Sequence, residues 1–291
     1  MSKLSRREWS KLAISSIAAA PLYSEIFAAG KPNSKIKGVQ IGAQSYSFRD
    51  RGLDEAIKGF VEIGLSSCEL FSGHLEPKGL DRAGMRNWRL TTPMQFFTLT
   101  GEKFKAAGID LYALNYSFRD DFTDEEIKRG FEIAKALGAR AITASSNVST
   151  VKRIDPFARQ YKMRVGVHNH SNIKPNEFAT PDDFSKAMAG MSEYICINLD
   201  IGHFTAANFD AVDFLNKNHD KIVALHIKDR KRNQGANVPF GQGDTPIKAV
   251  LELLMKNKWK IPANIEYEYN GSDTVTEVKR CYEFCRKALG G

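Results

Sequence analysis

Apolar, strand-like runs alternate with amphipathic, helix-like runs from Val39 to the end of the chain, and this alternation constrains the fold more than any other feature. Eight strands are expected, at residues 39–45, 67–71, 109–115, 139–144, 164–170, 194–200, 221–227 and 261–268. The helices that follow them are expected at residues 53–64, 92–108, 124–138, 154–162, 181–188, 209–218, 247–256 and 275–289. Eight such units in about 250 residues predict an α/β protein with a single (β/α)8 barrel, the TIM barrel.

Glycine placement supports the helix boundaries and argues against the main alternative fold. Gly64, Gly108 and Gly138 each close a helical run, at the position after a helix where glycine is preferred. No G-x-G-x-x-G pattern follows the first strand, which counts against a doubly wound dinucleotide-binding sheet. Two long polar segments that follow strands, 72–91 and 228–246, are expected as loops that form a lid, a substrate rim or plain surface decoration.

The N-terminus carries an export pattern. The pair Arg6-Arg7 is followed by a mildly apolar, alanine-rich stretch from Leu12 to Ala29. This order is typical of a Tat-type signal peptide, and a basic amphipathic helix is the alternative. The expected organisation is a signal peptide at 1–29, a linker at 30–36 and one barrel domain at 37–291, and the expected location is the periplasm.

Bulk composition narrows the choice of partners. The net charge of +8 is spread along the chain, so it permits anionic partners without requiring nucleic acid. No run of eighteen apolar residues occurs, so no membrane-spanning helix is expected. The four cysteines include no C-x-x-C pair, which counts against a thiolate zinc site. We expect a soluble protein with a small-molecule partner, no nucleic-acid partner and a homo-oligomeric state left open.

Ionisable side chains gather at the C-terminal ends of the expected strands, where barrel enzymes place their active sites. Five of the six histidines lie there: His74, His168, His170, His203 and His226. If the last four strands are neighbours in a closed barrel, the residues that converge near its mouth are His168, Asp200, His226 and Glu266. Two imidazoles and two carboxylates suit one divalent ion, Mn²⁺, Zn²⁺, Co²⁺ or Fe²⁺, with Mg²⁺ as a further candidate. Buried carboxylates need a compensating cation, which favours a metal site over a purely structural cluster.

Other polar residues near this rim are candidates for chemistry or for contacts to a substrate. His203 follows Asp200 by three residues on a predicted loop, and Glu268 shares a strand face with Glu266 because side chains alternate along a strand. The expected catalytic residues are Glu266, His168 and Glu69. The expected substrate-binding residues are His170, His203, Lys228, Asn115 and Glu268. The structural alternatives are a core histidine for His226, a rim ion pair for Glu268 and an acceptor of loop amides for Glu69.

Five short motifs occur in the order in which one superfamily carries them. They are Val167-His168-Asn169-His170, Leu199-Asp200-Ile201-Gly202-His203, Leu225-His226-Ile227-Lys228-Asp229, Gly241-Gln242-Gly243-Asp244 and Ile265-Glu266-Tyr267-Glu268. Together they resemble the xylose-isomerase-like barrel superfamily, and within it the sugar phosphate isomerase/epimerase group that also holds endonuclease IV. The resemblance covers about residues 37–290.

The resemblance implies a metal held by Glu, Asp, His and Glu at the ends of the last four barrel strands. Asp200, His226 and Glu266 match the last three positions, whereas His168 stands where many members have glutamate. In the epimerases that glutamate is also one of two acid/base groups, so a histidine here departs from plain two-base epimerisation. Histidine can still bind a metal or abstract a proton.

The expected function is that of a divalent-metal-dependent carbohydrate isomerase or epimerase that works through a metal-stabilised enediolate. Glu266 or a nearby histidine would be the base, Lys228 would neutralise a developing oxyanion, and His203 would hold or protonate a hydroxyl. Loss of a leaving group from the same enediolate would instead give a keto-glycoside lyase or dehydratase. Two alternatives come from other classes: an endonuclease IV-like phosphodiesterase and a non-catalytic sugar-binding barrel.

Overall fold

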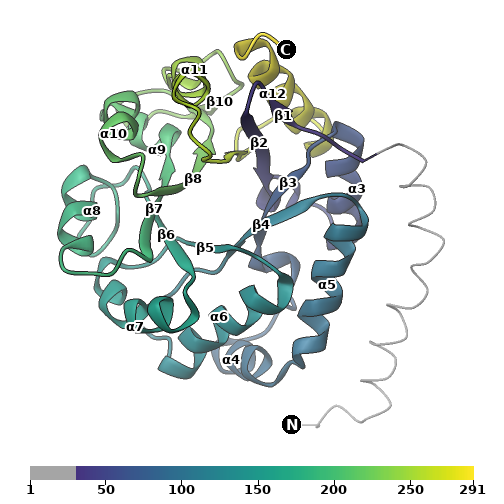
Figure 1. The fold of residues 1–291 in the computed structure, drawn as a ribbon, viewed down its shortest axis with the longest axis vertical. Helices are drawn as coiled ribbons and strands as arrows, with labels where there is room; N and C mark the ends of the chain where they lie inside the picture. The colour runs from purple at the N-terminus through teal and green to yellow at the C-terminus, as the bar shows by residue number, and fades with distance from the viewer. Residues whose placement is uncertain (1–30) are drawn as a thin grey trace.

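The computed structural model describes residues 31–291 and shows a closed barrel of parallel strands inside a ring of helices (Figure 1). The barrel strands are β2 (Val39–Gln44), β3 (Ser67–Phe71), β4 (Asp110–Asn115), β5 (Ala141–Ala144), β6 (Arg164–His168), β7 (Ile195–Asp200), β8 (Ile222–Ile227) and β11 (Ala263–Ile265). Neighbouring strands pair in this order, and β11 and β3 both pair with β2, which closes the sheet. The single (β/α)8 barrel predicted from the sequence is confirmed.

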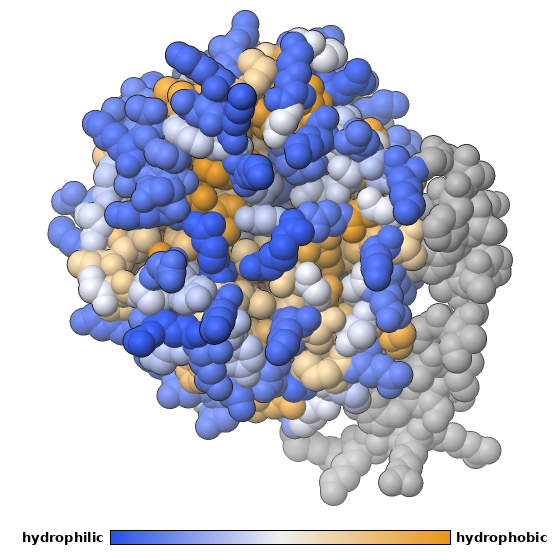
Figure 2. Space-filling model, viewed as in Figure 1, coloured by the Kyte–Doolittle hydropathy of each residue, from blue (hydrophilic) through white to orange (hydrophobic). Residues whose placement is uncertain are grey.

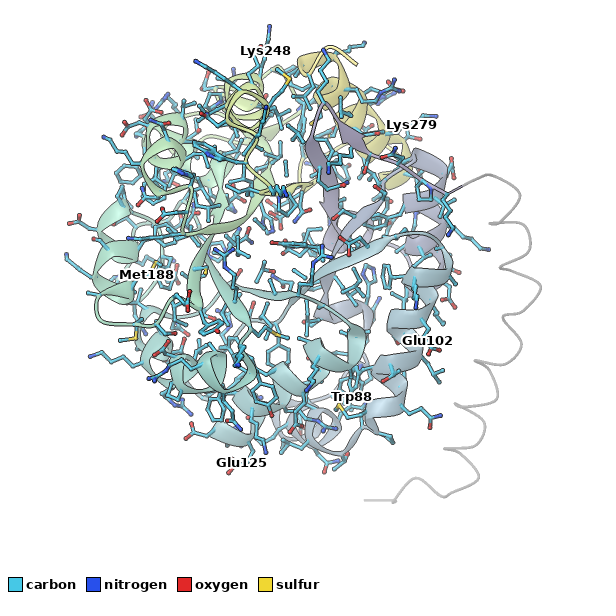
Figure 3. The ribbon with its side chains drawn as sticks, in the orientation of Figure 1. Trp88, Glu102, Glu125, Met188, Lys248 and Lys279 are labelled. Atoms are coloured by element: carbon cyan, nitrogen blue, oxygen red, sulfur yellow. The ribbon has the colours of Figure 1, made fainter. Side chains whose placement is uncertain are left out.

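A ring of helices covers the outer face of the barrel. Its main members are α3 (Leu53–Ile63), α5 (Met94–Ala106), α6 (Asp124–Leu137), α7 (Val151–Tyr161), α8 (Pro181–Met188), α10 (Ala211–Asn218), α11 (Ile247–Asn257) and α12 (Thr274–Ala288). Each buries apolar residues on one side, and charged side chains such as Glu125, Lys248 and Lys279 point outward (Figure 3). The outer surface of the ring is consequently mostly hydrophilic in the view of Figure 2.

The first described residues belong to the barrel. β1 (Lys35–Ile36) pairs antiparallel with β2, and Ser34 is fully buried. The hydroxyl of Ser34 donates a hydrogen bond to Ile41 O at 2.5 Å and lies 3.0 Å from Ser66 Oγ. Part of the stretch 30–36 that the sequence predicts as a linker therefore packs against the strands. The predicted signal peptide lies outside the described residues, so the Tat-type signal and the periplasmic location stay predictions.

Two strands end earlier than the sequence predicts. β6 ends at His168 instead of residue 170, and β11 ends at Ile265 instead of residue 268. β11 stops where its neighbour β8 stops, since Ile265 pairs with Ile227 and β8 ends there. β6 stops at His168, which pairs with Asn198, two residues before the end of β7. Glu266 and Glu268 therefore lie beyond the strand, so their predicted place within a strand is wrong. Their side chains nevertheless point to the same side, since both contact the ammonium of Lys228.

Segments predicted as loops contain regular structure. Asp200 caps α9 (Ile201–Ala206) by accepting a hydrogen bond from the backbone N–H of His203 at 2.6 Å, so His203 lies on a helix and not on a loop. Segment 72–91 contains η2 (Ser72–His74) and α4 (Arg82–Thr91), and segment 228–246 contains a hairpin of β9 (Asp229–Arg230) and β10 (Asn237–Val238). α4 has no fully buried residue, and its apolar contact to the core is made by Trp88, whose ring packs edge-on against Phe97 at 5.9 Å between centres. A side with so few apolar residues is hard to recognise in a sequence.

Helix α4 is attached to the barrel through a buried carboxylate. Glu126, near the start of α6, has no exposed surface and accepts hydrogen bonds from Arg82 Nη1 at 2.9 Å and from Arg86 Nε at 2.7 Å. Burial alone would raise the pKa of Glu126, but the hydrogen bonds from the two arginines outweigh it and hold that pKa below its ordinary value.

Replacing Glu126 by glutamine should destabilise the folded protein by about 1–3 kcal/mol at neutral pH. This is less than the roughly 3–5 kcal/mol of a fully buried pair, because the side chains of Arg82 and Arg86 are each 37% exposed. A carboxyl whose folded pKa is lowered contributes stability above its unfolded pKa of about 4.3 and loses it as the pH falls through the folded value.

Urea unfolding of the wild type and of Glu126→Gln should therefore converge as the pH falls below about 4. Glu125→Gln, an exposed neighbour on the same helix, is the matched control and should leave the unfolding free energy almost unchanged at every pH. A difference between wild type and Glu126→Gln that persists undiminished in acid would contradict the assignment.

Candidate metal centre and active site

Four side chains from consecutive strands meet at the C-terminal mouth of the barrel. His168 is the last residue of β6, Asp200 is the last residue of β7, His226 lies in β8 and Glu266 directly follows β11. Strand register brings them level, because Asp200 pairs with His226 across β7 and β8. One nitrogen or carboxylate oxygen from each residue lies within 4.8 Å of all the others, and all four residues are buried. The convergence expected from the sequence is therefore present.

The distances within this cluster fit a shared cation. Asp200 Oδ2 lies 3.3 Å from His168 Nε2 and 3.9 Å from His226 Nδ1, and Glu266 Oε2 lies 3.1 Å from His226 Nδ1. Within residues 31–291, the buried His226 Nδ1 has no partner in hydrogen-bonding geometry, whereas Glu266 Oε2 is paired with the ammonium of Lys228 at 2.7 Å. Buried polar atoms are normally satisfied, so an unpartnered His226 Nδ1 that faces two carboxylates fits a metal ion as its missing partner. A set of two nitrogens and two oxygens suits Mn²⁺, Fe²⁺, Co²⁺ or Zn²⁺.

Glu69 orients His226 through the ring nitrogen that faces away from the cluster. Both of its carboxylate oxygens lie 2.9 Å from His226 Nε2, and the same carboxylate accepts hydrogen bonds from Thr143 Oγ1 at 2.6 Å and from Asn264 Nδ2 at 3.1 Å. Burial alone would raise the pKa of Glu69, but the charge and the hydrogen bond of His226 lower it. A carboxylate on the far nitrogen fixes the ring and leaves Nδ1 turned toward the metal site. Glu69 is fully buried, so it orients His226 from a position that a substrate does not reach.

Lys228 brings a buried positive charge to the mouth of the cluster. Its ammonium lies 3.1 Å from Asp200 Oδ2, 2.7 Å from Glu266 Oε2 and 2.5 Å from Glu268 Oε2, and the residue is 2% exposed. Burial alone would lower the pKa of Lys228, but these three carboxylates raise it, so the lysine stays charged. Burial would likewise raise the pKa of Glu266, whereas Lys228 and His226 hold it well below the ordinary value.

Two further imidazoles, those of His170 and His203, lie next to His168 and line the pocket beside the cluster. The ring centre of His168 lies 5.0 Å from that of His170 and 5.9 Å from that of His203, and the last two are 5.4 Å apart. Burial lowers the pKa of His170 to about 4, with a further contribution from His168, so His170 is neutral at physiological pH. Burial also lowers the pKa of His203. Arg230 Nη1 donates a hydrogen bond to His203 Nδ1 at 2.7 Å.

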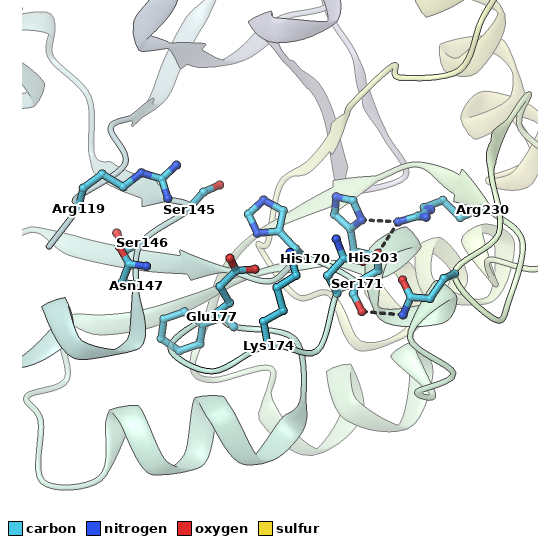
Figure 4. Close-up of a pocket in the computed structure, with 13 residues that line it drawn as sticks. Arg119, Ser145, Ser146, Asn147, His170, Ser171, Lys174, Glu177, His203 and Arg230 are labelled. Atoms are coloured by element: carbon cyan, nitrogen blue, oxygen red, sulfur yellow. Dashed lines mark hydrogen bonds between the residues drawn. The ribbon is translucent and has the colours of Figure 1, made fainter. Parts of the chain in front are cut away.

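A pocket of about 500 Å³ opens beside these histidines (Figure 4). Its walls come from the segments that follow β4, β5, β6 and β8, and they are mostly polar. Among the residues that line it are Arg119, Ser145, Asn147, Lys174, Glu177 and Arg230. His170 and His203 also line the pocket, so a ligand inside it would lie next to the metal-ligand cluster.

The structure places the other expected site residues at different depths. Lys228, His203 and Glu268 surround the cluster, and His170 faces the pocket. Asn115 ends β4 and is almost fully buried, where its amide donates to Thr143 Oγ1 at 3.2 Å, so it lies beneath the mouth with Glu69.

Sequence reasoning missed several supporting residues. Asn198 Nδ2 lies 3.0 Å from His226 Nε2, and Asn264 holds Glu69. A signal for both was present, because Asn198 precedes Asp200 by two residues and Asn264 precedes Glu266 by two, the spacing of side chains that share one face of the chain. Arg230 was also missed, and no local pattern in the sequence indicates its contact with His203.

The chain is a (β/α)8 barrel. Buried imidazoles and carboxylates converge at its C-terminal mouth in an arrangement that resembles a metal site. Residues 60–288 match the family described as xylose isomerase-like TIM barrel. The chain belongs to this family, which confirms the resemblance seen in its motifs.

Known proteins agree with this assignment. L-ribulose-5-phosphate 3-epimerase UlaE of Escherichia coli O157:H7 (strain EC4115 / EHEC) is 23% identical over 180 residues, which cover 57% of this chain and 63% of that protein. The match thus spans less than two thirds of the curated relative. An uncharacterized protein from Parabacteroides distasonis ATCC 8503 is 25% identical in a structural comparison that covers 86% of this chain and 99% of that one, with a TM-score of 0.63.

A further solved structure shares the fold alone. The 3-keto-D-glucoside 4-epimerase YcjR of E. coli is 14% identical, with 86% of this chain and 99% of that chain covered and a TM-score of 0.64. Among residues 31–291, no helix is long and apolar enough to cross a membrane.

Proposed function

We propose that this protein is a divalent-metal-dependent carbohydrate isomerase or epimerase that works through an enediolate. The observation that carries the proposal is the convergence of His168, Asp200, His226 and Glu266, with the buried Nδ1 of His226 left without a hydrogen-bond partner among residues 31–291. Family membership and the similarity to a sugar-phosphate epimerase support it. The identity of the sugar is left open.

The four clustered residues would hold the ion, and the ion would polarise a substrate carbonyl and stabilise negative charge on the adjacent oxygen. The protein's own residues divide the remaining work. Glu266 is kept ionised by Lys228, so its carboxylate can accept a proton from the carbon next to the carbonyl. His168 takes the position of the second acid/base group, and its Nδ1 lies 3.3 Å from Ser145 Oγ, which orients the ring.

Charge development at the substrate oxygens is met by Lys228. Its ammonium is fully desolvated among three carboxylates, so it is held in place before a substrate arrives. Preorganised charge in a water-poor site stabilises a developing anion more strongly than a mobile surface lysine could.

The pocket beside the cluster would take the rest of the sugar. Hydroxyl and amide groups such as those of Ser145 and Asn147 are suited to sugar hydroxyls, and His170 and His203 connect the pocket to the reacting end. The volume of about 500 Å³ also leaves room for a substituent on the sugar. That room favours a lyase reaction as the second candidate, because a leaving group next to the reacting carbon needs such a space.

Metal analysis combined with solvent exchange tests the proposal. Purified full-length protein should contain one divalent ion per chain, and after metal loading it should introduce deuterium from D₂O next to the carbonyl of at least one aldose or ketose in a panel observed by NMR. Treatment with EDTA should stop the exchange, and added Mn²⁺ should restore it. Formation of an unsaturated product would identify the lyase instead. A protein that takes up no stoichiometric divalent ion and is indifferent to EDTA would refute the proposal.

A further inference from the structure

Arg230 is held rigidly at the edge of the site. It lies in β9, which forms a short hairpin with β10. Its guanidinium fixes the loop by two hydrogen bonds to the carbonyl of Gly235, from Nε at 3.1 Å and from Nη2 at 2.7 Å. Nη1 also donates to Ser171 Oγ at 2.8 Å. The remaining contact of Nη1 is the hydrogen bond to His203 Nδ1 at 2.7 Å, drawn in Figure 4.

This last contact determines where His203 carries its proton. A guanidinium has donors and no acceptor, and it stays protonated in proteins. His203 Nδ1 must therefore be the acceptor, so it bears a lone pair and the ring proton is on Nε2. The contact excludes both the opposite tautomer and the doubly protonated ring for as long as Arg230 stays in place.

The proton on Nε2 has no acceptor of its own among the described residues. Lys228 Nζ lies 3.2 Å from Nε2 and competes as a donor, but its ammonium already has three carboxylate partners at 2.5, 2.7 and 3.1 Å. The shorter contact from Arg230, at 2.7 Å, therefore decides the tautomer. The nearest carboxylate oxygen, Asp200 Oδ2, is 3.9 Å away, beyond hydrogen-bonding distance. His203 lines the pocket, so an oxygen of a bound molecule can take this hydrogen bond.

We propose that Arg230 is a positioning residue that holds His203 in its Nε2–H tautomer, so that His203 donates a hydrogen bond to a substrate oxygen and does not serve as a base. The nature of the acceptor rests on the proposed function, whereas the tautomer does not. His203 and Lys228 then form a pair of adjacent donors beside the metal-ligand cluster. Proton abstraction is left to Glu266 and His168.

The tautomer can be read directly in full-length protein labelled with ¹⁵N-histidine. In long-range ¹H–¹⁵N spectra, the His203 resonances, identified by their loss in His203→Gln, should show an unprotonated Nδ1 and a protonated Nε2. In Arg230→Met the ratio of the two tautomers should change by at least about tenfold, because a hydrogen bond from a charged donor is worth a factor of that order. Arg230→Lys keeps the charge and should restore part of the wild-type ratio.

Arg232→Met is the matched control, because Arg232 is an exposed arginine of the same hairpin. It should leave the spectrum of His203 unchanged. Unchanged resonances of the other histidines and an unchanged Tm would show that Arg230→Met is folded. A wild-type His203 protonated on Nδ1, or a tautomer ratio unmoved in folded Arg230→Met, would overturn the inference. Either result would leave the metal and solvent-exchange tests of the proposed function untouched, and a negative result in those tests would leave the tautomer standing.

Discussion

Asp200→Asn should weaken divalent-metal binding by at least about 100-fold and abolish metal-dependent turnover. Asp200 Oδ2 is the oxygen around which His168 Nε2, His226 Nδ1 and Lys228 Nζ are arranged, at 3.3, 3.9 and 3.1 Å. An amide supplies no negative charge to a cation. The backbone cap should survive, since the oxygen that accepts from His203 N is Oδ1 and asparagine caps helices as well as aspartate does. Titration calorimetry with Mn²⁺ and with Zn²⁺ measures the loss.

Asp210→Asn is the control for this experiment. Asp210 caps α10 through hydrogen bonds from Val212 N at 2.9 Å and Asp213 N at 3.0 Å, so it repeats the capping role of Asp200 away from the cluster. Its substitution should alter neither metal affinity nor turnover. If Asp200→Asn bound metal within a few-fold of the wild type, Asp200 would have to be removed from the ligand set.

Glu69→Gln should lower metal affinity by about 10–100-fold, the usual effect of losing the partner that orients a ligating histidine. Both oxygens of Glu69 face His226 Nε2 at 2.9 Å, and an amide would place either a weaker acceptor or an N–H against that nitrogen. The ring could then turn Nδ1 away from Asp200 and Glu266. The reduced affinity should be visible in calorimetry, and saturating metal should recover much of the turnover.

Glu277→Gln separates this effect from a general loss of stability. Glu277 is also buried, and it accepts hydrogen bonds from Ser272 Oγ at 2.7 Å and from Tyr269 Oη at 2.8 Å, neither of which belongs to the four clustered residues. Its substitution should lower the Tm and leave metal affinity as in the wild type. Equal effects of the two substitutions on metal affinity would show that Glu69 acts through stability alone.

The alternation of strands and helices was sufficient to predict the barrel, because each element can be recognised from the local spacing of its apolar residues. His168 and Asp200 end strands, so their positions follow from the predicted strand boundaries. Their convergence could therefore be predicted once the strand order was assumed. Glu266 was placed correctly at the mouth although its strand ends one residue before it. The chain position of a ligand was thus easier to predict than the local structure around it.

The remaining errors and omissions share a physical cause. α4 is held by arginines on Glu126 in addition to the packing of Trp88 on Phe97, and the hairpin that carries Arg230 has strands of two residues each. Contacts of this kind join residues far apart in the chain through single polar atoms, and no periodic pattern records them. The place of Glu69 behind His226 depends in the same way on the closed barrel, since β3 and β8 meet only across its interior.

The origin of the four clustered residues in the sequence has a consequence for the order of events during synthesis. All four come from the second half of the barrel, and the last of them, Glu266, follows β11. Glu69, the carboxylate that aligns His226, comes from β3, 157 residues before His226. A nascent chain that lacks β11 has neither Glu266 nor the strand that joins β8 to β2. If the proposed metal binds, its complete site would exist only after the last strand has been added, so metal uptake would follow the early steps of folding and would not guide them.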